Sequence, residues 1–307
     1  MTAAGRVDAH HHVWDLTVRD QDWIRGEELR PLRRSFGLDD LTPQAREVGV
    51  TSTVLVQTVT VAEETPELLS LAEEDGLVAG VVGWTDLTAP DIDETLAHLR
   101  TLPGGRHLVG IRHQVQSEPD PQWLLRRDVL RGLAAVAAAE LAYDLVIVER
   151  QLPAAIRAAT LLPQLVFVLD HAGKPPITTG EREPWATDVR SFAALPNTVC
   201  KLSGLVTEAR WDSWTVEDLR PYAQTVLDAF GPDRVMFGSD WPVCTLAASY
   251  KEVTQGMEDL TSGLETRERS AVFGRTARRI YGLHDAPTGG GDATGPGPGD
   301  PHHPRTP

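Results

Sequence analysis

Eight short apolar runs recur along the chain, and amphipathic stretches separate them. Most runs are continuous rather than alternating, as in residues 53–56 (TVLV) and 165–169 (LVFVL). Strands that are apolar on both faces are typical of a parallel sheet covered by helices. The pattern predicts strands over residues 6–13, 52–59, 77–84, 108–115, 143–150, 164–171, 197–203 and 234–240.

Helical patterns fill the intervals between these runs. Thr42 and Pro43 have the residue types of an N-cap and a first helical position, and Gly49 is a stop signal at the other end. Eight regular alternations of strand and helix indicate an α/β fold and favour a (β/α)8 TIM barrel. The other predicted helices cover residues 65–75, 92–99, 129–140, 154–160, 185–194, 216–230, 250–263 and 266–281.

Length and composition favour one domain followed by a tail. A chain of 307 residues with 41% hydrophobic and 24% charged residues is ordinary for a globular protein, and α/β barrels of this size form one domain. We expect the barrel to cover residues 1–283. Residues 284–307 are rich in Gly and Pro and cannot build a packed element, so we expect a disordered tail there.

The net charge and the cysteine content indicate which partners and which cellular location to expect. The formal net charge of −15 argues against nucleic acid and anionic membranes as partners. No apolar run reaches membrane-spanning length, and residues 1–6 lack the apolar centre of a signal peptide. Two cysteines, Cys200 and Cys244, do not make a disulfide scaffold, so we expect buried thiols and a cytoplasmic location.

A His-x-His pair ends the first run. Residues two apart on a strand point to the same side, so we expect His10 and His12 to face one ligand while His11 faces the other way. Asp8 has the same parity, and we expect it to orient one imidazole from below. The pair also has a structural explanation, as hydrogen-bonded histidines at a strand end.

Two further titratable residues end later runs. His171 ends the sixth, and Asp240 ends the eighth, directly before Trp241. A carboxylate at a strand end beside an aromatic ring suits a general base in a partly desolvated site. Since the carboxyl ends of barrel strands meet at one mouth, we expect His10, His12, His171 and Asp240 to converge there.

Other strand ends carry polar or aromatic residues as well. Arg112 and His113 lie on the fourth strand, where parity allows one of them to point inward. A long first connection, of the kind that shapes binding sites, carries aromatic and basic residues. Each of these residues singly has a structural explanation, so their convergence indicates the site. The remaining candidates are Trp14, Trp23, Glu149, Lys201 and Trp241.

Five motifs together resemble the amidohydrolase superfamily, in its sugar-lactonase-like branch known as amidohydrolase 2. The resemblance spans residues 6–283 and implies a distorted (β/α)8 barrel of the metal-dependent-hydrolase type. It also implies a hydrolase that opens a lactone, such as L-fucono- or L-rhamnonolactone. The motifs are residues 7–14 (VDAHHHVW), 110–113 (GIRH), 169–176 (LDHAGKPP), 200–205 (CKLSGL) and 237–242 (FGSDWP).

The resemblance also implies roles. Asp240 would take a proton from the water that attacks the lactone carbonyl, and His171, Arg112 or His113 would stabilise the oxyanion. One divalent ion, with zinc as the first candidate, would be held by His10, His12, His171 and Asp240. Strand five ends in Val148-Glu149-Arg150-Gln151, without the histidine of two-metal relatives, so two bridged metals are not expected. Metal-independent catalysis is the alternative.

The expected partner is a small-molecule substrate, and a homodimer is the candidate assembly. Trp14, Trp23, Glu149, Lys201 and Trp241 are the residues that we expect to hold the sugar. Three other functions stay open at this point. They are metal-dependent decarboxylation of an aromatic acid, hydrolysis of an amide, and ligand binding by a catalytically silent barrel.

Overall fold

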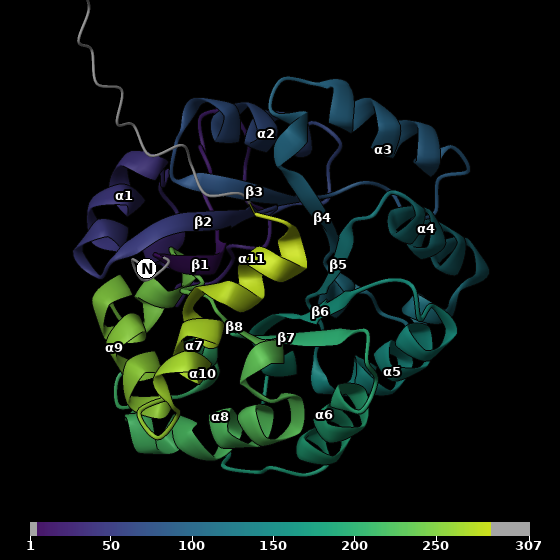
Figure 1. Ribbon diagram of the computed structural model, residues 1–307. Helices are drawn as coiled ribbons and strands as arrows, with labels where there is room; N and C mark the ends of the chain where they lie inside the picture. Colours follow the sequence, from purple (N-terminus) through teal and green to yellow (C-terminus); the bar gives the residue numbers. More distant parts are fainter. Residues whose placement is uncertain (1–4, 284–307) are drawn as a thin grey trace, which may run out of the picture.

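Eight parallel strands lie side by side in chain order in the computed structural model, which describes residues 5–283 (Figure 1). This order and direction confirm the predicted barrel. The strands are β1 (Arg6–His11), β2 (Val50–Val56), β3 (Val78–Gly83), β4 (Leu108–His113), β5 (Ala142–Leu145), β6 (Phe167–Leu169), β7 (Thr198–Leu202) and β8 (Val235–Phe237).

The barrel closes through residues just beyond the regular part of β8. His11 and Trp241 form a parallel bridge. The His12 amide donates to the Trp241 carbonyl at 2.7 Å, and the Asp240 amide donates to the His10 carbonyl at 2.8 Å. The seam between the last and the first strand therefore consists of only a few backbone contacts.

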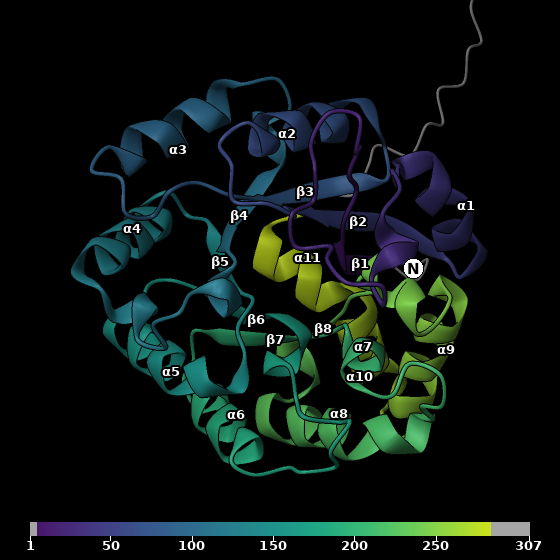
Figure 2. The same cartoon turned by 180° about the vertical axis from the view of Figure 1, so that it is seen from behind.

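Helices surround the barrel on its outside (Figures 1 and 2). The first begins at Leu38, four residues before the predicted Thr42, because the Asp40 carboxylate accepts from the Gly37 amide and caps this end. Pro43 consequently lies inside the helix. The helices are α1 (Leu38–Glu47), α2 (Glu64–Glu74), α3 (Ile92–Thr101), α4 (Arg127–Ala138), α5 (Leu152–Leu161), α6 (Trp185–Ala193), α7 (Leu205–Glu208), α8 (Val216–Phe230), α9 (Tyr250–Leu260), α10 (Thr266–Ser270) and α11 (Thr276–Tyr281).

The last predicted helix, residues 266–281, is not one uninterrupted α-helix. A π-helical segment, Ala271–Arg275, joins α10 to α11. Helix α11 then lies across the barrel, as Figure 1 shows. Its residues Ala277 and Tyr281 pack into the apolar cluster inside the barrel, with Val7 and Met236. Helix α11 thus closes the amino-terminal end and leaves the other mouth for a site.

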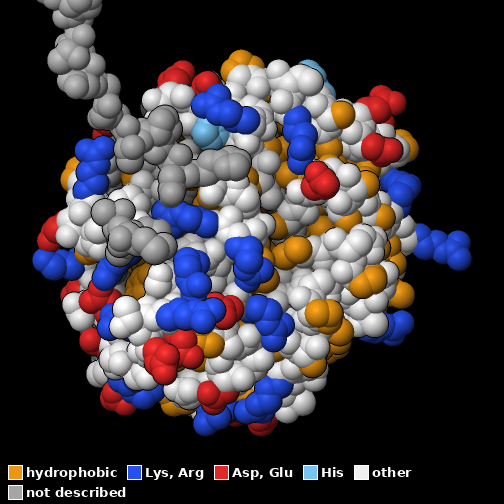
Figure 3. Space-filling model, in the orientation of Figure 1, with side chains coloured by type: hydrophobic (Ala, Val, Ile, Leu, Met, Phe, Trp, Pro, Cys, Tyr) orange, Lys and Arg blue, Asp and Glu red, His pale blue; other side chains and the backbone are white. Residues whose placement is uncertain are grey.

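The face that carries α11 has a mixed surface. Basic side chains gather near its centre, with acidic side chains among them (Figure 3). Arg278 and Arg279 lie in the last turn of α11. The net negative charge of the chain is therefore not spread evenly over its surface.

Strand β1 contains an irregularity that changes its side-chain parity. Asp8 pairs with Thr53 and His11 pairs with Leu55, so a three-residue step on β1 faces a two-residue step on β2. This is the geometry of a β-bulge. Both Val7 and Ala9 pack inside the barrel, which directs Asp8 between them to the outside.

The prediction that Asp8 orients an imidazole from below is therefore wrong. Its carboxylate accepts from the Ser239 amide and hydroxyl, at 2.8 and 2.6 Å, and from the Tyr250 hydroxyl at 2.9 Å. Asp8 instead ties β1 to the segment after β8 and to α9. Its only contact with His10 is to the backbone amide, at 3.1 Å.

Several other expectations concern the whole chain. Cys200 and Cys244 are both free and buried, as predicted. Among residues 5–283, no helix combines the length and apolarity needed to cross a bilayer. The predicted tail, residues 284–307, lies outside the described residues.

Candidate active site

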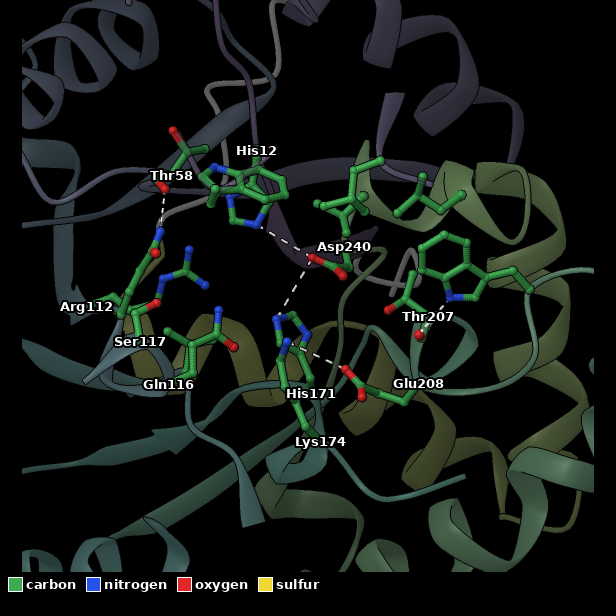
Figure 4. A pocket seen from close by; sticks show the side chains of 17 residues that line it. His12, Thr58, Arg112, Gln116, Ser117, His171, Lys174, Thr207, Glu208 and Asp240 are labelled. Atoms are coloured by element: carbon green, nitrogen blue, oxygen red, sulfur yellow. Dashed lines mark hydrogen bonds and ion pairs between the residues drawn. The ribbon is translucent and has the colours of Figure 1, made fainter. Parts of the chain in front are cut away.

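A cavity of about 260 Å³ opens at the carboxyl ends of the strands (Figure 4). Polar residues from the carboxyl end of β4 and from the segments that follow β1, β2, β4, β6, β7 and β8 line it, together with apolar side chains. The polar residues are His12, Thr58, Arg112, Gln114, Gln116, Ser117, His171, Lys174, Thr207, Glu208 and Asp240; the apolar and aromatic ones are Trp23, Leu29, Val146, Trp211, Val243 and Leu246.

Three histidines and one aspartate meet at the bottom of this cavity, as predicted. His10 Nε2 lies 3.2 Å from His12 Nε2 and 3.7 Å from Asp240 Oδ1. Asp240 Oδ1 lies 3.5 Å from His12 Nε2 and 3.9 Å from His171 Nε2. Residues separated by up to 230 positions in sequence therefore form one buried cluster.

The hydrogen bonds of the cluster indicate which imidazole nitrogens are free. His12 Nδ1 lies 2.8 Å from the Val56 carbonyl, an acceptor, so Nδ1 carries the proton and Nε2 is bare. His10 Nε2 lies 3.4 Å from Arg112 Nη1, which can only donate, so this nitrogen is bare as well and the proton is on Nδ1, 3.3 Å from Asp170 Oδ1. Two nitrogen lone pairs then face each other and a carboxylate.

This arrangement fits a divalent cation. A cation bound by His10, His12 and Asp240 would neutralise the carboxylate and accept both lone pairs, and their ligand atoms all lie within 4.8 Å of one another. Nitrogen and oxygen donors of this kind suit zinc. Asp170 lies behind His10. A carboxylate in this position commonly orients a metal-binding imidazole.

Burial sets the charge of these groups. It lowers the pKa of His171 to about 4 and holds that of His10 well below its usual range, so both imidazoles are neutral at neutral pH. Burial raises the pKa of Asp240, but its contacts with His171, His12 and His10 lower it by more. Asp240 is therefore an ionised carboxylate, as a general base must be.

Two unusual turns hold His171 and Asp240 in place. His171 has a φ of 53° and Asp240 a φ of 58°, in the left-handed region that costs non-glycine residues energy. Gly204 passes so close that a Cβ there would lie 2.7 Å from His171 Nδ1 and 3.1 Å from Asp240 Oδ2. His171 Nδ1 also lies 3.0 Å from the Ser203 hydroxyl.

A network of buried charges lies beneath the cluster. Lys201 Nζ lies 2.5 Å from Asp144 Oδ2, 3.1 Å from Asp170 Oδ1 and 3.1 Å from His10 Nδ1. Arg112 Nη1 lies 3.1 Å from Asp170 Oδ2 and 3.4 Å from His10 Nε2. Two cations and two carboxylates thus balance one another around the His10 side chain.

The sequence predicted Arg112 and His113 as alternatives, and the structure places only Arg112 inside. His113 points outward, stacks on Trp123 with ring centroids 4.3 Å apart, and lies 2.8 Å from Glu118 Oε1. It does not line the cavity. The parity argument is confirmed, and the suggestion that His113 stabilises an oxyanion loses its geometric basis.

Of the five residues expected to hold the substrate, Trp23 alone lines the cavity. Trp14 and Trp241 are 5% and 1% exposed, and both make edge-to-face contacts with the Phe36 ring. Lys201 lies in the network below. Strand β5 has only four residues, and Glu149 begins the short 3-10 helix that follows it. These four placements correct the sequence prediction.

Eight polar and aromatic lining residues were not predicted. Most follow a strand by only a few residues, in loops whose conformations a single sequence does not fix. Position after a strand end is the signal that could have identified them. They are Thr58, Gln114, Gln116, Ser117, Lys174, Thr207, Glu208 and Trp211.

Known proteins resemble this chain over nearly its full length. The sequence matches the amidohydrolase family over residues 7–283. It is 42% identical to an L-fucono-1,5-lactonase of Burkholderia multivorans, over 91% of this chain and 96% of that protein. An L-fucono-1,5-lactonase of Burkholderia ambifaria is 38% identical, over 92% and 97%.

The fold also resembles a crystal structure. An amidohydrolase of Burkholderia multivorans with bound zinc superimposes with a TM-score of 0.84 and 41% identity, over 92% of this chain and 100% of that one. The zinc belongs to that structure. The buried His and Asp cluster of the present chain has the donor set that such an ion requires.

Proposed function

The chain belongs to the amidohydrolase family, and on that premise we propose that it hydrolyses a sugar-derived lactone, with L-fucono-1,5-lactone as the first candidate. The observation that carries the proposal is 42% identity to a lactonase across 91% of the chain. The cavity supports it, because an ionised Asp240 lies beside His12 and the neutral imidazole of His171 at its bottom.

In the proposed reaction Asp240 orients a water molecule and takes its proton as the oxygen attacks the lactone carbonyl. Arg112, which points at the cluster from the cavity floor, supplies positive charge for the oxyanion. Asp240 then returns the proton to the ring oxygen as the C–O bond breaks. General acid–base catalysis of this kind contributes roughly a hundred- to ten-thousand-fold in rate.

We further propose that one zinc ion is the cofactor, held by His10, His12 and Asp240, with His171 adjacent. When bound, such an ion polarises a carbonyl and lowers the pKa of a coordinated water. His12 donates from Nδ1 to Val56, which keeps its Nε2 free for the metal. His171 borders the reacting carbonyl and is fixed by Ser203.

The test is lactone hydrolysis, followed by proton release, over a panel of aldonolactones. Wild-type protein is compared with Asp240→Asn, in as-purified, chelator-treated and zinc-supplemented forms. We expect turnover of one stereochemical series by wild type and a loss of at least a hundredfold in the variant. Near-normal turnover by Asp240→Asn would refute the proposed base, and no turnover of any lactone by wild type would refute the function.

A further inference from the structure

One ion pair lines the cavity beside the histidine cluster and has no hydrogen bond or ion pair to the three histidines or Asp240. Lys174 Nζ lies 3.5 Å from Glu208 Oε1, and each side chain is about one quarter exposed. Figure 4 shows the pair on the side of the cavity opposite Thr58. The proposed reaction uses neither residue, so the pair is free to contact the part of the substrate that does not react.

The backbone holds this pair in place from two loops. The Thr178 amide and hydroxyl both donate to the Glu208 carbonyl, at 3.1 and 2.7 Å, and this joins the loop after β6 to helix α7. Lys174 has a φ of 54° at the end of the left-handed turn that begins at His171. The indole of Trp211 donates to the Thr207 carbonyl at 2.9 Å. Hydrogen bonds within the protein therefore hold the backbone that carries the carboxylate, and the carboxylate itself pairs with Lys174.

Charge pairing inside the cavity argues against an anionic substrate. Arg112 and Lys174 are the two Lys or Arg residues in its lining, and each already has a carboxylate partner, Asp170 and Glu208. On the Glu208 side of the cavity, a substrate carboxylate would meet another carboxylate in place of a free cation. Like charges brought together in this way repel and weaken binding.

The same carboxylate suits a neutral ligand with several hydroxyl groups. An ionised carboxylate offers about four acceptor positions, and Glu208 uses few of them in its contact with Lys174. Sugar hydroxyls donate and accept, so adjacent hydroxyls can bind the carboxylate and the ammonium together. Lactone rings without hydroxyls have no hydrogen to donate.

We propose that Glu208, held by Lys174, selects neutral polyhydroxylated lactones by accepting hydrogen bonds from adjacent ring hydroxyls and by repelling lactones that carry a second anionic group. The inference rests on the proposed lactonase function and names its substrate class. A site built to bind a hydroxyl discriminates strongly against an analogue that lacks it, because its polar groups are then left unpaired.

The experiment compares Glu208→Gln and Lys174→Gln with wild type on three lactones. These are L-fucono-1,5-lactone, the hydroxyl-free ring δ-valerolactone, and D-glucaro-1,4-lactone, which carries a carboxylate. Glu181→Gln is the matched control, since Glu181 is exposed and lies outside the cavity lining. Thermal melting of each variant checks that it is folded.

For Glu208→Gln we expect kcat/KM on the fuconolactone to fall about 10- to 100-fold, mainly through KM, because ground-state binding is lost. The kcat/KM on valerolactone should stay within about threefold of wild type, and the kcat/KM on the glucarolactone should rise about tenfold because the repulsion is removed. Lys174→Gln should move the glucarolactone the opposite way, down by about tenfold. Glu181→Gln should match wild type on all three.

Two results would overturn the inference while leaving the proposed function intact. One is an equal fold loss on fuconolactone and valerolactone in Glu208→Gln, which would indicate a structural role. The other is an unchanged fuconolactone kcat/KM. L-Fucose, a neutral ring that is not hydrolysed, provides a test independent of turnover. Calorimetry should give at least tenfold weaker binding to Glu208→Gln, and equal binding would refute the inference even if wild type hydrolysed none of the lactones.

Discussion

Replacing Lys201 with methionine should be among the most destabilising single changes in the barrel. Lys201 is fully buried, and its ammonium lies 2.5 Å from Asp144 and 3.1 Å from Asp170, both also fully buried. Methionine keeps most of the side-chain volume but leaves two carboxylates with less compensation. Breaking a buried ion pair by removing one partner costs about 3–5 kcal/mol.

The loss should depend on pH in a defined direction. Burial raises the pKa of Asp144 to about 6, and Lys201 opposes this rise. Without Lys201 the pKa rises further, so the folded variant binds a proton more readily than the unfolded chain does. The folded state is then relatively stabilised as pH falls, and the destabilisation should be larger at pH 8 than at pH 5.

Urea unfolding followed by tryptophan fluorescence measures this, since the chain has eight tryptophans. We expect a loss of about 3–5 kcal/mol at pH 8, and at roughly 2–4 °C per kcal/mol a melting temperature lower by about 6–20 °C. Lys251→Met is the control, because its ion pair with Glu47 is exposed and should contribute less than about 1 kcal/mol. A loss below about 1 kcal/mol for Lys201→Met, or equal losses at both pH values, would refute the reasoning.

Three further predictions follow from the site. Gly204→Ala should lower activity at least tenfold and the free energy of unfolding by more than about 1 kcal/mol. The reason is that Gly204 has a φ of 63° and a Cβ there would contact His171. Wild-type kinetics in this variant would contradict the prediction. His113→Phe should keep kcat/KM within about threefold, because the ring stacks on Trp123 outside the cavity; a hundredfold loss would restore His113 to the catalytic site. Zinc at a hundred times its dissociation constant should raise the free energy of unfolding of wild type by about 2.7 kcal/mol, measured by urea unfolding. The double variant His10→Ala, His12→Ala should show no such increase.

The sequence predicted most of the fold, and the reason is periodicity. Continuous apolar runs such as residues 165–169 indicate strands buried on both faces, and their order along the chain is the order in the barrel. The convergence of His10, His12, His171 and Asp240 followed from that topology, because each lies at a strand's carboxyl end. This prediction needed only the position of each residue along its strand and not the contacts between the side chains.

Irregular strand and loop conformations explain the parts of the candidate site that the sequence did not predict. Strict alternation places Asp8 beside His10 and His12, but a bulge of one residue turns it outward. Trp14 and Trp241 look like sugar-stacking residues in the sequence, yet both are buried and in contact with the Phe36 ring. Glu208 belongs to a one-turn helix set by Gly204 and Thr178, which only the three-dimensional arrangement reveals.

The seam that closes the barrel has a consequence for local opening. The amides of His12 and Asp240 form two backbone hydrogen bonds between the chain after β8 and the end of β1, and the side chains of the same residues meet in the cavity. Any fluctuation that separates these strands also separates the two side chains to which the proposed function assigns roles. A ligand that bridges the two side chains would therefore slow hydrogen exchange at both amides, and the exchange rate at the seam would report occupancy of the site.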